Sequence, residues 1–181
     1  MKIAAIAGSL RKDSYNKKLL SNALSFLSDQ ETDVIDLRSL SLPVYDFDMQ
    51  ADGFPNMVKE LSARIKSADA LIIATPEYNH GIPGGLKNAI DWISRSPEKP
   101  LNNKTAFIMG ASTGGFGAMR GIYALRQTLL VFNIITLPQT VMVSFADKAF
   151  DENGKLKDEK ILAQLKAGCD ELVRITSALK R

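Results

Sequence analysis

The sequence predicts an α/β protein in which five parallel strands form a three-layer, doubly wound sheet with helices on both faces. The first observation is that short apolar runs alternate with segments of helical period, as they do in repeated strand–helix units. The second is length, because 181 residues are enough to bury one three-layer core. The third is composition, since 45% apolar and 24% charged residues are typical of a globular protein. We therefore expect residues 1–181 to form one domain.

The expected strands are short runs rich in apolar residues, each followed by a turn or a polar segment. They span Lys2–Ala7, Asp33–Leu37, Ala70–Ala74, Lys104–Gly110 and Thr140–Ser144.

Between these runs, apolar residues recur every three or four positions, which is the spacing of one face of an α-helix. The expected faces are Leu20, Ala23, Leu24 and Leu27; Val58, Leu61 and Ile65; Leu86, Ala89, Ile90 and Ile93; Ile122, Leu125 and Leu129; and Ile161, Leu165, Leu172 and Leu179.

The topology of such a sheet indicates where a ligand binds. Crossovers between parallel strands are right-handed, and the ligand crevice lies outside the carboxyl ends of the strands, where the direction of winding reverses. We therefore expect function to reside in the loops after the first, third and fourth strands, namely Gly8–Ser14, Thr75–Gly85 and Ala111–Gly117.

Charge and composition exclude several functional classes. The formal charge is +3, and the basic residues are interleaved with acids, which argues against a nucleic-acid partner. The apolar run Thr128–Leu137 is short and contains Asn133, and a strand begins at Lys2, so we expect neither a membrane span nor a signal peptide and place the protein in the cytoplasm. With Cys169 as the single cysteine and His80 as the single histidine, no disulfide or metal site is expected.

The first loop, Gly8–Asn16, has the features of an anion site. Glycine allows a tight exit from the strand, Ser14 is a candidate N-cap, and the helix start directs free N–H groups into the crevice. Arg11 offers a forked donor to phosphate oxygens, with Ser9, Ser14 and Asn16 as further donors. The alternative is a capped turn with surface charges and no ligand.

Other phosphate-binding folds fit this loop poorly. A P-loop needs a Gly-Lys-Ser/Thr ending and a dinucleotide turn needs three spaced glycines, whereas only Gly8 is present. A low-molecular-weight phosphatase needs a cysteine in this loop, but Cys169 lies in the last expected helix.

The second loop combines prolines and glycines in a way that predicts a rigid backbone close to a flat ligand. Tyr78 offers an aromatic surface, and N–H groups from Asn79 to Gly81 could reach the polar edge of a flavin, with a positive φ expected at Gly81. Glu77 and His80 are either loop-stabilising residues or proton-transfer groups. The third loop, Gly110–Gly117, is also glycine-rich and would permit backbone approach, although alone it fits an ordinary turn.

Two segments resemble the NADPH-dependent FMN reductase family, which includes quinone reductases, azoreductases and chromate-reducing flavoproteins. The segment Gly8–Asn16 resembles the family pattern Gly-Ser-x-Arg followed by Ser-x-Asn, and Pro76–Trp92 resembles Pro-Glu-Tyr-Asn followed by Pro-Gly-x-Leu-Lys-Asn-Ala-Ile-Asp-Trp. The resemblance extends at least to the third loop and implies a flavodoxin-like fold. It implies an FMN site made of Ser9, Arg11, Ser14 and Asn16 at the phosphate, Pro76, Glu77, Tyr78, Asn79 and Gly81 along the isoalloxazine, and Ser112, Thr113, Gly114 and Gly115 on the pyrimidine side.

The resemblance also implies an activity. FMN would carry the redox chemistry, with NADPH or NADH as hydride donor and no catalytic side chain, in ping-pong two-electron reduction of quinones, azo compounds, flavins or similar small-molecule acceptors. Homodimers or homotetramers are implied as well. The alternative is a flavodoxin-like FMN electron carrier without NAD(P)H turnover, which Arg11 and the positive net charge disfavour. A hydrolase would need a triad, and the single His80 lies in the flavin loop. The acceptor, the choice between NADH and NADPH, and the oligomer size stay open.

Overall fold

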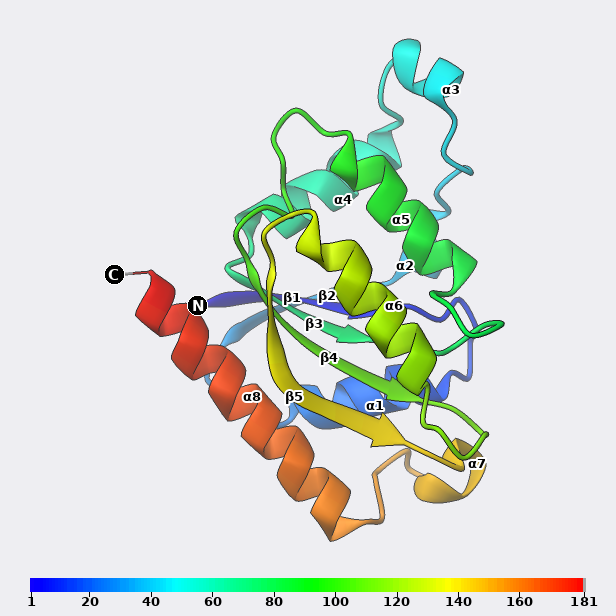
Figure 1. Ribbon diagram of the computed structural model, residues 1–181, viewed down its shortest axis with the longest axis vertical. Coiled ribbons are helices and arrows are strands. Elements are labelled where there is room, and N and C mark those ends of the chain that lie inside the picture. The colour runs from blue at the N-terminus through cyan, green and yellow to red at the C-terminus, as the bar shows by residue number, and fades with distance from the viewer. Residues whose placement is uncertain (181) are drawn as a thin grey trace.

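A computed structural model describes residues 1–180 and shows one sheet between two layers of helices (Figure 1). The strand order is β2-β1-β3-β4-β5, and every neighbouring pair is parallel. This is the order of the flavodoxin-like doubly wound fold, so the predicted fold class is confirmed.

The elements follow one another in near-strict alternation. The strands are β1 (Lys2–Ala7), β2 (Glu31–Ile35), β3 (Ala70–Ala74), β4 (Thr105–Ala111) and β5 (Ile135–Val143). The helices are α1 (Tyr15–Leu24), α2 (Leu37–Leu40), α3 (Phe47–Ala51), α4 (Asn56–Ser67), α5 (Gly84–Ser94), α6 (Met119–Leu130), α7 (Ala146–Ala149) and α8 (Glu159–Leu179).

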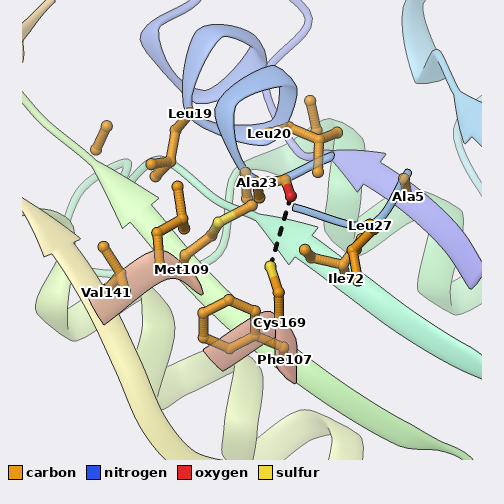
Figure 2. Close-up of a cluster of buried hydrophobic side chains, with 14 of the residues drawn as sticks. Ala5, Leu19, Leu20, Ala23, Leu27, Ile72, Phe107, Met109, Val141 and Cys169 are labelled. Atoms are coloured by element: carbon orange, nitrogen blue, oxygen red, sulfur yellow. Dashed lines mark hydrogen bonds between the residues drawn. The ribbon is translucent and has the colours of Figure 1, made fainter. Parts of the chain in front are cut away.

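The sheet is buried on both faces because helices cover both, and successive strand residues point to opposite faces. Ala5 belongs to the core under α1 and α8, whereas its neighbour Ile6 belongs to the core under α4, α5 and α6. Figure 2 shows the first of these cores, in which Cys169 of α8 lies near Phe107 and its thiol donates to the Ala23 carbonyl of α1 at 3.6 Å. Small and branched apolar residues on each strand therefore hold both helical layers.

The bounds of the second and fourth strands differ from the predicted ones. The second strand ends at Ile35 and not at Leu37, because the Asp36 carboxylate accepts from the Arg38 N–H at 3.0 Å and caps α2. The fourth strand is shifted by one residue, to 105–111.

The fifth strand begins five residues earlier than expected, at Ile135 instead of Thr140. Its first half contains Pro138, which has no N–H to donate and which is tolerated here because β5 is an edge strand. That proline hid the strand pattern in the sequence.

The long helices match the predicted faces with two differences. Leu27 is buried but lies beyond the end of α1, and Leu179 is 56% exposed at the end of α8, so it is not a core residue. The short helices α2, α3 and α7 were not expected, because four or five residues are too few to show a helical period. Among residues 1–180, no helix is long and apolar enough to cross a lipid bilayer.

The carboxyl ends of β1, β3 and β4 meet at one edge of the sheet. Ala7 is in register with Ala74, and Ala74 with Met109. Backbone hydrogen bonds continue into the loops, from Gly8 N–H to the Ala74 carbonyl at 2.8 Å and from Thr75 N–H to the Met109 carbonyl at 2.9 Å. The three loops singled out in the sequence are therefore brought side by side.

Candidate functional site

A cleft of about 130 Å³ lies where these three loops meet. Most of the residues predicted to bind a cofactor line it, while Asn79, Gly81, Gly114 and Gly115 lie in the same loops outside the lining. Sequence reasoning missed Tyr15 and Ala111, which flank polar motif residues but carry no motif signal themselves. The lining residues are Ser9, Arg11, Ser14, Tyr15, Asn16, Pro76, Glu77, Tyr78, Ala111, Ser112 and Thr113.

Two serine hydroxyls of the first loop are buried at the cleft. Ser9 and Ser14 are each 3% exposed. The Ser14 hydroxyl accepts from the Asn16 N–H at 3.2 Å, so Ser14 is the N-cap of α1 as predicted, and the Ser9 hydroxyl accepts from the Arg11 N–H at 3.3 Å. Within residues 1–180, neither hydroxyl donates to a protein acceptor. Buried donors normally find a partner, so these two are available to a ligand.

The same loop is positively polarised. Arg11 is exposed at the cleft, and its guanidinium forms no ion pair or hydrogen bond with the part of the chain that the structure describes. Backbone N–H groups of residues 12–15 likewise donate to no acceptor among those residues. With the N-terminus of α1 behind them, these donors have the chemistry to bind an anion.

Asn16 has a structural role that the sequence did not indicate. Its side-chain amide donates to the Ala111 carbonyl at 2.9 Å, and its amide oxygen accepts from the Ala111 N–H at 2.9 Å. This pair joins the first turn of α1 to the last residue of β4. The predicted contact between Asn16 and a phosphate stays a prediction.

The second loop carries a tight hairpin from Tyr78 to Gly81. The Gly81 N–H donates to the Tyr78 carbonyl at 3.0 Å and the Tyr78 N–H donates to the Gly81 carbonyl at 3.2 Å. Asn79 and His80 have φ values of 49° and 65°, which is the signature of a type I′ turn. The expected positive φ at Gly81 is therefore wrong, because the two central residues of this turn take the left-handed conformation. A Cβ added at Gly81 would lie 3.7 Å from the Tyr78 carbonyl oxygen, an ordinary contact.

Glu77 is held as a carboxylate beside the start of α6. Its oxygens accept from the Arg120 N–H at 2.8 Å, the Gly121 N–H at 3.1 Å and the Arg120 guanidinium at 3.3 Å. Burial acts to raise the pKa of Glu77, but the hydrogen bonds from Gly121 and Arg120 outweigh it and lower the pKa below its ordinary value. These contacts match the loop-stabilising interpretation of Glu77.

The third loop is tied to the end of β5. The Ser112 N–H donates to the Val143 carbonyl at 3.0 Å, and the Ser112 hydroxyl accepts from the Gly114 N–H at 3.1 Å. Gly117 has a φ of 55°, and a Cβ there would lie 2.8 Å from the Met142 carbonyl carbon, so only glycine fits. These contacts hold the third loop against β5, where its Ser112 and Thr113 line the cleft.

Comparison with known proteins agrees with this geometry. Residues 1–148 match the sequence model of the NADPH-dependent FMN reductase family. An NAD(P)H-dependent FMN reductase of Pseudomonas aeruginosa is 46% identical over 162 residues, covering 88% of this chain and 86% of that protein. A quinone reductase of Escherichia coli K12 is 37% identical over 169 residues, covering 91% and 89%.

A solved structure is similar over nearly its whole length. The flavoenzyme NAD(P)H:(acceptor) oxidoreductase from Paracoccus denitrificans superposes with a TM-score of 0.87 at 32% identity, covering 98% of this chain and 97% of that one. Because a family model covers most of the sequence and relatives of this identity span nearly all of it, the expectation of an NAD(P)H-dependent FMN oxidoreductase is confirmed and the chain belongs to the NADPH-dependent FMN reductase family.

Proposed function

We propose that the cleft between the three loops is the FMN site and that the first loop holds the phosphate. The observation that carries the proposal is the donor set of this loop. It combines the buried hydroxyls of Ser9 and Ser14, the unpaired Arg11 guanidinium and the free N–H groups of residues 12–15, all without acceptors among residues 1–180. A dianionic phosphate monoester satisfies such donors, and Glu77, the carboxylate in the lining, already has N–H partners on its oxygens.

The other two loops supply the walls for the ring. Tyr78, which is 48% exposed, and the adjoining hairpin offer an aromatic surface and backbone donors. Ser112 and Thr113 of the third loop also line the cleft. When bound, FMN supplies the two-electron redox chemistry, taking electrons from NAD(P)H and passing them to an acceptor. The residues proposed for the ring are Pro76, Glu77, Tyr78, Asn79 and Gly81 along the isoalloxazine and Ser112, Thr113, Gly114 and Gly115 on its pyrimidine side.

The acceptor that we propose is a small quinone. The E. coli relative is named a quinone reductase, which supports this class, while azo compounds and flavins are further candidates. We expect ping-pong kinetics, in which the oxidised donor leaves before the acceptor enters the same cleft.

A homodimer or homotetramer in the cytoplasm completes the proposal. Tyr123 and Leu130, two turns apart on α6, are 55% and 63% exposed, and the adjacent Val131 is 75% exposed. Exposed apolar side chains on one helix support contact with a second copy. Sedimentation velocity of the purified protein measures the oligomeric state, and fractionation of the host cell tests the location.

An absorption spectrum followed by anaerobic addition of NADPH or NADH tests the central claim. We expect flavin bands in the purified or FMN-reconstituted protein, bleaching by the donor without a partner protein, and return of colour on adding a quinone. Absence of FMN binding would refute the site. FMN binding without bleaching by either donor would favour the electron carrier.

A further inference from the structure

Helix α6 begins without a cap of its own. Its N-cap position is Ala118, which has a φ of 66° and a side chain that cannot accept a hydrogen bond. The first N–H groups of a helix need acceptors, and Ser, Thr, Asp or Asn usually provides one from the N-cap position. The acceptor for α6 must therefore come from elsewhere in the chain.

Glu77, more than forty residues earlier, provides this acceptor. One carboxylate oxygen accepts from the N–H groups of Arg120 and Gly121, at 2.8 and 3.1 Å, and the other accepts from the Arg120 guanidinium. The side chain is 13% exposed, so these contacts are largely shielded from water. A negative charge at this position also interacts favourably with the positive end of the α6 dipole.

Two further contacts join the same segments. Gly121 lies so close to the second loop that an added Cβ would be 2.9 Å from the Pro76 carbonyl oxygen and 3.1 Å from the Glu77 Cα. The Arg120 guanidinium lies 4.5 Å from the ring centroid of Phe116, which belongs to the third loop. The second loop and the third loop therefore both contact the start of α6, the second through Glu77 and the third through the Phe116–Arg120 contact.

We propose that Glu77 is a positioning residue, whose carboxylate locks the Tyr78–Gly81 hairpin to α6 so that the cleft is formed before FMN enters. This inference rests on the proposed FMN site. Of the two roles that the sequence left open for Glu77, loop stabilisation and proton transfer, it selects the first. The hairpin follows Glu77 directly, so releasing the carboxylate frees the hairpin at its base. All three hydrogen bonds to Glu77 come from α6, and none of them depends on a ligand.

The test compares FMN dissociation constants of apo-protein variants by fluorescence titration. Glu77→Ala should weaken FMN binding by about tenfold to a hundredfold, because part of the binding free energy must then order a hairpin that the hydrogen bonds to the carboxylate no longer hold. The FMN dissociation constant of Glu77→Gln should lie between those of the wild type and Glu77→Ala, because an amide oxygen still accepts from the two N–H groups. Asp170→Asn breaks an exposed ion pair with Lys166 on α8 and serves as a control that should bind FMN like the wild type.

A second variant reaches the same loop without touching the carboxylate. Gly121→Ala places a methyl group against Pro76 and Glu77 and should also weaken FMN binding by about tenfold, although alanine forms helices better than glycine. Unfolding of each apo-protein, followed by the fluorescence of the buried Trp92, separates loss of affinity from loss of fold.

The outcomes distinguish this inference from the proposed function. Failure of the wild type to bind FMN would sink the proposed function itself. Wild-type affinity in both Glu77→Ala and Gly121→Ala, with FMN bound by the wild type, would overturn positioning alone. Unchanged FMN affinity with a kcat at saturating FMN at least tenfold lower in Glu77→Gln would instead establish proton transfer.

Discussion

Replacing Asn16 with alanine should lower the stability of the FMN-free protein, in addition to any effect on FMN affinity. The Asn16 side chain is 3% exposed, and its amide forms a pair of hydrogen bonds with the backbone of Ala111, which is 2% exposed. Truncation leaves a buried N–H and a buried carbonyl of β4 without partners. The first turn of α1 also loses its connection to the sheet edge.

The expected magnitude follows from these two groups. A buried polar group left without a partner costs about 1–3 kcal/mol. Because Ala111 lines the cleft, water can reach part of the vacated space and reduce this cost. We therefore expect the free energy of unfolding to fall by about 2–4 kcal/mol in Asn16→Ala. Asn16→Asp should also be destabilised, because a carboxylate can accept from the Ala111 N–H but repels the Ala111 carbonyl.

Urea unfolding of the FMN-free protein measures this effect, with the single Trp92 as the fluorescent probe. Asn153→Ala is the matched control, because Asn153 is exposed and its side chain forms no hydrogen bond with the described residues. If Asn16→Ala unfolds within about 0.5 kcal/mol of the control, the structural role of Asn16 is refuted. If FMN affinity then falls alone, Asn16 acts directly on the phosphate.

Three further predictions concern Arg11, Gly81 and Cys169. Arg11→Ala should raise the FMN dissociation constant about tenfold to a hundredfold in titrations, because it removes a charge-assisted hydrogen bond, while apo-protein unfolding should not change. Gly81→Val should leave the free energy of unfolding near that of the wild type, since a Cβ there meets only an ordinary contact at 3.7 Å. Its effect should instead be a loss of FMN affinity in titrations. Equal losses of stability and of FMN affinity would mean that the loop is only structural. Burial raises the pKa of Cys169 to about 12 from an ordinary value of 9.0, so its contribution to stability is complete below pH 9 and is lost as pH rises through 12. A thiol reagent should therefore label the native protein slowly at pH 8 and the urea-unfolded protein rapidly.

Local features of the fold could be predicted from the sequence. Ser14 stands directly before an amphipathic run and does cap α1, because an N-cap bond depends on residues two apart. The buried strands of the sheet centre also matched, since Ala70–Ala74 is apolar throughout and lies between helices on both faces. Pattern and structure agree wherever the determining contacts are close in sequence.

Turn geometry was predicted in part. A rigid backbone in the second loop was expected from its glycines and prolines, and positive φ was expected at Gly81 because glycine adopts that conformation most easily. The type I′ turn instead requires positive φ at Asn79 and His80. Asparagine is enriched in the left-handed region, so Asn79 was the signal that could have located the turn.

Contacts between distant segments could not be predicted from residue type. A polar side chain beside a ligand crevice can either contact the ligand or satisfy the exposed ends of strands and helices, and both roles favour the same residues. Asn16 reaches Ala111 and Glu77 reaches Arg120 only after the chain has folded, and both then have protein partners.

Ser9, Ser14 and Arg11 differ from Asn16 and Glu77 in having donors without protein acceptors among the described residues. This difference in hydrogen-bond partners distinguishes the residues that we propose for the FMN phosphate from those that hold the cleft together. Substitutions in the two groups should therefore have different effects in solution. Removing a phosphate-binding side chain should change FMN affinity while leaving the apo-protein intact, whereas removing Asn16 should destabilise the apo-protein before any ligand is added.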